Sequence, residues 1–103
     1  MALNIQIDQQ KLAAFADKWG IQDLAIFDTH EREGEGLITD VMYTHIEGVR
    51  SPSYLGGYFD MEDELGAILG RRVAMDHRET VRNYAGQKHF EDYLRTMQVI
   101  YVR

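Results

Sequence analysis

The chain contains no cysteine, which excludes disulfide bridges and thiolate metal sites. It also lacks any run of about 20 apolar residues, the length that a membrane-spanning helix requires. The first residues have neither the basic start nor the apolar segment of a signal peptide. We therefore predict a cytoplasmic protein with no membrane partner.

Basic residues are in the minority, since 11 Lys and Arg stand against 17 Asp and Glu and give a net charge of −6. Duplex nucleic acid requires a basic face, so we expect no such partner. A small nucleotide held through a metal ion stays compatible with this charge. Proline occurs once, and no linker, repeat or low-complexity tract divides the 103 residues. Residues 1–103 are therefore predicted to form a single domain.

Hydrophobic periodicity predicts a helix over residues 8–19, with Asp8 as its N-cap and Gly20 as the left-handed residue that ends it. Residues 23–28 and 37–46 have the composition of strands and flank a charged, glycine-bearing turn. The remaining expectations are a helix that is firm over 60–69, a strand over 73–75, a mostly loop segment over 77–86, a helix over 88–97 and an apolar tail over 99–102.

This order of elements predicts an α+β fold in two layers, with a small mixed sheet and helices packed on one face. The joints between these elements are Lys18-Trp19-Gly20-Ile21 before Leu24-Ala25-Ile26-Phe27, the segment 62–73, and Val99-Ile100-Tyr101-Val102. With the order of elements, these residues resemble the minimal nucleotidyltransferase family of the DNA polymerase β superfamily, and the resemblance implies a nucleotidyltransferase-like fold.

The family's signature is Gly-Ser, ten residues, then Asp-x-Asp, with a third acidic residue on the third strand. The Gly-Ser backbone approaches the terminal phosphates of the nucleotide because no bulky side chain intervenes. The carboxylates hold two Mg²⁺ ions, which bridge the triphosphate and activate the acceptor hydroxyl. Two hard cations need several anionic oxygens, so one carboxylate alone does not hold them.

The phosphate-binding half of this signature falls, without a gap, on Asp28-Thr29. The arginine that the family carries three residues past its serine matches Arg32. Asp28 replaces the glycine and puts negative charge where phosphates would dock, whereas Thr29 is a mild change. By resemblance, Thr29 and Arg32 are the candidate nucleotide-binding residues.

The metal-binding half falls on Asp40 and Met42, with the third acidic position at Ala74. Only Asp40 keeps a carboxylate, and it is the candidate metal residue. Asp76 lies two residues past Ala74, on the same face of an alternating strand, and is a possible helper. A site rebuilt from Asp28, Asp40 and Asp76 is therefore an open alternative.

We interpret the chain as a pseudoenzyme, a nucleotidyltransferase fold that acts through protein–protein contact and needs no cofactor. The resemblance implies a helical partner of the HEPN type, as in toxin–antitoxin pairs where the nucleotidyltransferase is the antitoxin, or self-association as a homodimer. The alternative is an active enzyme that uses Mg²⁺ and ATP to transfer a nucleoside monophosphate to a protein or small molecule, and a third reading is a nucleotide sensor. Interfaces are enriched in aromatic residues and methionine, and the chain supplies Tyr43, Tyr54, Tyr58, Tyr84, Tyr93, Tyr101, Met42, Met61, Met75 and Met97.

A group of histidines and a run of glutamates are two further candidate sites. His45, Asp76 and His77 approach one another if the second and third strands are neighbours, but their spacing is no zinc signature, and surface histidines explain them. The glutamates of the turn between the first two strands read as a solvated loop, or alternatively as a contact for a basic partner.

Overall fold

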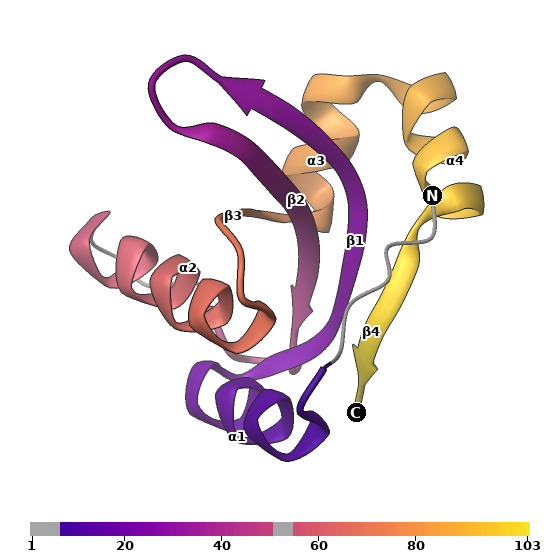
Figure 1. Cartoon of the computed structure of the whole chain (residues 1–103). Coiled ribbons are helices and arrows are strands. Elements are labelled where there is room, and N and C mark those ends of the chain that lie inside the picture. The colour runs from indigo at the N-terminus through magenta and orange to yellow at the C-terminus, as the bar shows by residue number, and fades with distance from the viewer. Residues whose placement is uncertain (1–6, 51–54) are drawn as a thin grey trace.

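A mixed four-stranded sheet, ordered β3-β2-β1-β4, organises the part of the chain that the structure describes (Figure 1). The computed structural model describes residues 7–50 and 55–103. β1 (Ile21–Arg32) and β2 (Gly36–His45) form an antiparallel hairpin. β3 (Val73–His77) runs parallel to β2, and β4 (Gln98–Val102) runs antiparallel to β1. The predicted α+β class and mixed sheet are confirmed.

Helices cover both faces of this sheet (Figure 1). Leu24 and Ile26 of β1 pack in one apolar cluster with α1 (Gln9–Trp19) and α2 (Leu55–Leu69). Ala25 and Phe27 pack in a second cluster with α3 (Arg78–Ala85) and α4 (Gln87–Thr96). Successive strand residues point to opposite faces, so an unbroken apolar run buries both of them. The prediction placed helices on one face of the sheet. In the structure α1 and α2 cover one face, and α3 and α4 cover the other.

The first helix begins and ends at the residues that the sequence predicts. The Asp8 carboxylate accepts hydrogen bonds from the backbone N–H groups of Gln10 and Lys11, both at 3.1 Å. Gly20 follows the helix with φ of +67°, and a Cβ there would lie 2.4 Å from Cγ1 of Val49. Glycine is thus required at this joint by both its backbone conformation and its close packing.

Two segments differ from their prediction. Residues 78–85, expected to be mostly loop, form α3, which has Val81 as its buried residue and His77 as its N-cap. The Nδ1 atom of His77 accepts a hydrogen bond from the backbone N–H of Glu79 at 3.1 Å. The expected apolar tail is the edge strand β4, and Ile100 is its buried residue. A polar helix with one buried apolar residue, and a five-residue strand, give little periodic signal.

The second helix also begins earlier than the expected firm part, at Leu55 rather than residue 60. Tyr54, one of the tyrosines considered for an interface, lies outside the described residues. Within the described residues, no helix has the length and apolar character needed to cross a membrane.

Candidate functional site

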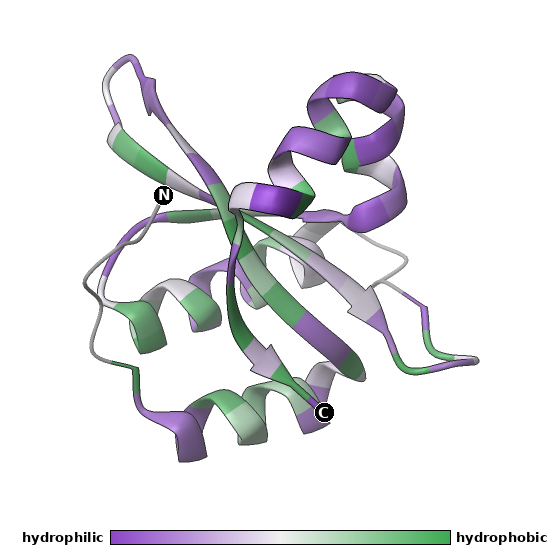
Figure 2. Cartoon of the chain, turned by 90° about the vertical axis from the view of Figure 1, so that its right-hand side faces the viewer, coloured by the Kyte–Doolittle hydropathy of each residue, from purple (hydrophilic) through white to green (hydrophobic). Residues whose placement is uncertain are grey.

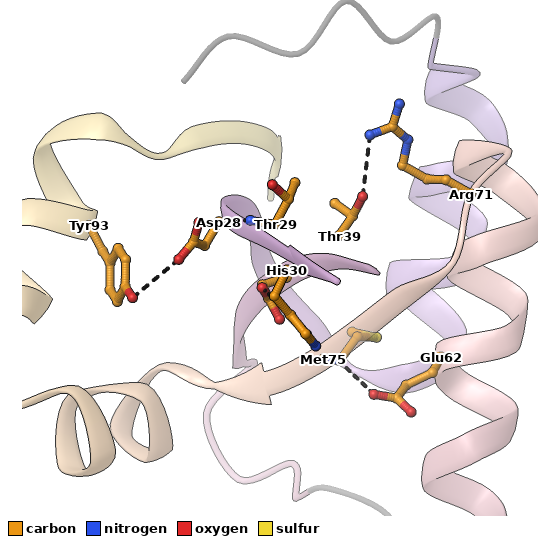
Figure 3. Close-up of polar contacts among 9 residues, drawn as sticks. Asp28, Thr29, His30, Thr39, Glu62, Arg71, Met75 and Tyr93 are labelled. Carbon is orange, nitrogen blue, oxygen red and sulfur yellow. Dashed lines mark hydrogen bonds and ion pairs between the residues drawn. The ribbon is translucent and has the colours of Figure 1, made fainter. Parts of the chain in front are cut away.

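The β1–β2 hairpin places two aspartates directly opposite each other. Asp28 and Asp40 are paired at their Cα atoms, and a register shift between Ile26 and Asp28 precedes the pair. The hydroxyl of Tyr93, on α4, donates to Oδ2 of Asp28 at 3.4 Å, and Figure 3 shows these two side chains pointing toward each other. Asp28 therefore lies on the sheet face that α3 and α4 cover.

Asp40 and Asp76 share that face. Asp40 precedes Met42 by two residues, and Met42 packs against α3 and α4. In the parallel pairing of β2 with β3, Ala74 is the partner of Asp40, and Asp76 is the partner of Met42. The predicted relation of these residues is thus confirmed, since Asp76 stands one step along the same face from Ala74.

Burial and mutual repulsion act on these carboxylates. Burial raises the pKa of Asp40, and the charge of Asp28 raises it further, while a hydrogen bond with His30 lowers it. His30 Nδ1 and Asp40 Oδ2 are 2.8 Å apart. Burial and then the charge of Asp40 raise the pKa of Asp76. The three aspartates therefore form an acidic cluster, defined here as Asp28, Asp40 and Asp76, in which negative charge disfavours the ionised forms of Asp40 and Asp76.

Two tyrosines from the covering helices lie close enough to the acidic cluster for its charges to act on them. Partial burial and the negative charges of Asp76 and Asp40 raise the pKa of Tyr84 to about 12. Partial burial and the charge of Asp28 raise the pKa of Tyr93. Both phenols stay protonated at neutral pH, and that of Tyr93 donates a hydrogen bond to Asp28. Tyr84 and His30 could not be assigned to the site from the sequence, because α3 was not predicted and the hairpin register was unknown; Tyr93 lies on the predicted helix, but the sequence did not show what it faces.

Each of the two candidate nucleotide-binding residues has a partner within the β1–β2 hairpin. The backbone N–H of Thr29 donates to Oδ1 of Asp28 at 2.8 Å. Arg32 Nη1 lies 3.3 Å from Oε2 of Glu35 in an ion pair. Arg32 is still close enough for its charge to lower the pKa of Asp40. The structure thus brings Arg32 toward the acidic cluster, but pairs it with the hairpin turn.

The two positions where the resemblance expects further metal carboxylates hold apolar side chains. Met42 is 0% exposed and packs with Ala25, Phe27, Val81 and Phe90. Ala74 is the direct neighbour of Asp40 and offers only a methyl group. Among the side chains that the structure describes, no group of three or more His, Asp or Glu is arranged to hold a metal ion.

The side chains of the second possible metal-binding group, His45, His77 and Asp76, lie on opposite faces of the sheet. The rings of His45 and His77 lie 5.6 Å apart, and each contacts the ring of Tyr43. Tyr43 belongs to the cluster beneath α1 and α2, whereas Asp76 faces α3 and α4. The expected approach of the two histidines is confirmed, and the expected approach of Asp76 to them is wrong.

A further acidic residue stabilises the edge of the sheet. Oε2 of Glu62, on α2, accepts a hydrogen bond from the backbone N–H of Met75 at 2.7 Å (Figure 3). Burial and the charge of Asp76 raise the pKa of Glu62. Because β3 is an edge strand, this carboxylate satisfies an N–H group that has no partner strand on that side.

Comparison of the chain with protein-family models, with curated proteins and with solved structures finds no match. The likeness to minimal nucleotidyltransferases thus rests on the residues and spacings quoted from the sequence.

Proposed function

We propose that this chain is a nucleotidyltransferase-like pseudoenzyme that acts through protein–protein contact. The observation that carries the proposal is the burial of Met42, which is fully enclosed among apolar residues that include Val81 and Phe90. A carboxylate at that position would be desolvated without a partner, at a cost of several kcal/mol. Position 42, where the resemblance expects the second metal ligand, is therefore part of the apolar core beneath α3 and α4.

Titration with ATP and Mg²⁺ tests the proposal that the acidic cluster is catalytically inactive. We expect ATP with Mg²⁺ to leave the melting temperature unchanged, because ligands stabilise a protein only by binding its folded state. A stabilisation of several degrees that Asp40→Ala abolishes, and that the exposed-site control Asp63→Ala retains, would contradict the pseudoenzyme reading.

The binding half of the proposal concerns the outer edge of β4. This strand, Gln98–Val102, has no charged residue in a chain of which 27% is charged. Val99 is 50% exposed and Val102 is 65% exposed. Figure 2 turns this side of the sheet toward the viewer, with the C-terminus at the end of the strand. Within residues 7–50 and 55–103, no strand pairs with this edge.

A second copy of the chain is the partner that this edge fits best. Edge strands are usually protected by charges or proline, and an unprotected edge pairs with another strand. Two identical β4 strands can pair antiparallel about a twofold axis, which is the commonest symmetry of oligomers. Two chains of net charge −6 repel, and a neutral strand lets them meet without opposing like charges. Arg103, which follows the strand, is already paired with Asp17 at 2.8 Å.

Light scattering coupled to gel filtration tests this contact. We expect a dimer for the natural chain and a monomer for Val99→Lys, because a charge on each strand would oppose its copy across the axis. Leu37→Lys is the matched control, since Leu37 is similarly exposed and pairs with Glu31, far along the hairpin from β4. A natural chain that is strictly monomeric would remove the support for self-association. A helical partner of the HEPN type would then be the remaining form of this proposal.

The second candidate function is a Mg²⁺-dependent nucleotidyltransferase with an altered site. The specific observation that favours it is the acidic cluster, in which three carboxylates from three strands share one face. Mg²⁺ keeps several waters and can use one or two protein carboxylates. Transfer of a labelled nucleoside monophosphate from ATP to an acceptor, lost in both Asp40→Ala and Asp76→Ala, would establish this function.

A further inference from the structure

An open groove runs between α1 and α2, on the face of the sheet opposite the acidic cluster. It has a volume of about 350 Å³. Ala14 and Phe15 of α1 and Ala67 and Ile68 of α2 supply its apolar surface. The alanines leave the space that larger residues would fill, so the groove exists because the two facing helices present small side chains there. Pockets for small ligands begin at about 300 Å³ and are mostly apolar.

The groove also carries positive charge in an acidic chain. Two lysines and one glutamate line it. Lys18 is already paired with Glu64, since its Nζ lies 2.7 Å from Oε1 of that residue. Lys11 stands in the first turn of α1 and, in the described part of the chain, takes part in no ion pair. One ammonium group is thus available beside the apolar surface, where it can receive an anion.

We propose that this groove binds a small amphiphilic carboxylate, such as a medium-chain fatty acid. The apolar tail lies along Ala14, Phe15, Ala67 and Ile68, and the carboxylate pairs with the ammonium of Lys11. A lysine that joins a long apolar stem to a charged head suits both halves of such a ligand. The groove is lined by no residue of β4 or of the acidic cluster, so its binding can be tested independently of the function proposed above.

The chain contains its own reporter for this binding. Trp19 is the only tryptophan, and the Nζ of Lys18 lies 5.2 Å from the centroid of its ring. A ligand in the groove alters the surroundings of Lys18 and therefore the fluorescence of Trp19. We expect saturable quenching or enhancement on titration with decanoate. Decyltrimethylammonium has the same tail length with the opposite charge, and should bind at least tenfold more weakly.

The variant Lys11→Glu separates a built site from general hydrophobic adsorption. We expect it to weaken decanoate binding at least tenfold, because it replaces attraction with repulsion. Residue 11 is the third residue of α1 after the Asp8 cap, and a glutamate there favours the helix, so the variant should keep its fold. Lys88→Glu, on α4, makes the same charge change away from the groove and should bind decanoate as the natural chain does.

A second variant tests the apolar half. Ala67 is exposed on α2, so Ala67→Leu fills the groove without disturbing the core and should also weaken decanoate binding at least tenfold. Amide chemical-shift changes under decanoate should concentrate on α1 and α2. The proposal is overturned if Lys11→Glu binds as tightly as the natural chain, if shifts spread over unrelated surfaces, or if decanoate fails to bind. Capture of an amphipathic peptide in place of decanoate would likewise overturn it.

Discussion

Placing a carboxylate at position 42 should unfold the protein rather than create a metal site. In Met42→Asp, the loss of the buried methionine side chain costs about 2–5 kcal/mol, as large-to-small core substitutions do. The new carboxylate is surrounded by Ala25, Phe27, Val81 and Phe90, none of which can pair with a charge. An unpaired buried charge adds about 3–5 kcal/mol. The sum is comparable with the whole stability of a small domain, about 5–15 kcal/mol.

Urea denaturation followed by circular dichroism measures this cost. Met42→Leu conserves volume and should lose less than about 1.5 kcal/mol. Ala74→Asp places a carboxylate on the same face, beside Asp40, at a partly exposed position, and should lose about 2 kcal/mol or less. A Met42→Asp protein that folds with nearly natural stability would refute the reasoning. It would mean that α3 and α4 do not enclose position 42, and the main support for the pseudoenzyme proposal would fall with it.

Two pH-dependent predictions follow from the shifted pKa values. Because its pKa is raised, ionised Asp76 destabilises the fold, so Asp76→Asn should gain up to about 1 kcal/mol at neutral pH, since solvent screens this half-buried group. Urea midpoints should show the gain disappearing as the pH falls toward 3.8, where the natural carboxyl is protonated. Burial lowers the pKa of His45, so stability present above pH 6.5 should be lost as the pH falls through its folded pKa. His45→Gln should flatten that slope, and an unchanged slope would contradict the assignment.

The sequence was sufficient to predict those features that a single residue or its near neighbours determine. Asp8 and Gly20 bracket α1 because a carboxylate before an apolar stripe and a glycine after it satisfy the helix ends. The alternation rule likewise placed Asp76 on the face of Asp40. These features depend on neighbours within a few residues, which the sequence displays directly.

Features set by distant contacts could not be predicted in the same way. α3 buries Val81 against residues of β1 and α4, and its cap is a histidine, so neither periodicity nor capping marks it. The register shift before Asp28 decides that this aspartate opposes Asp40. A bulge changes which residues meet across a hairpin, and sequence spacing contains no record of it. The acidic cluster was therefore only an alternative until the register was known.

The pseudoenzyme and the metal-dependent enzyme predict different effects of Mg²⁺ on the unfolding free energy of the protein. If the carboxylates bind nothing, burial and the charge of Asp40 disfavour ionised Asp76, and removing the charge of Asp76 stabilises the fold. If they bind Mg²⁺, the ion offsets that repulsion, and the natural chain gains stability with Mg²⁺ while Asp76→Asn does not. Measuring the unfolding free energy of both proteins with and without Mg²⁺ thus distinguishes a pseudoenzyme from a metal-dependent enzyme. We expect Mg²⁺ to leave both values unchanged, because Met42 and Ala74 are apolar at the two positions where the resemblance expects further metal carboxylates.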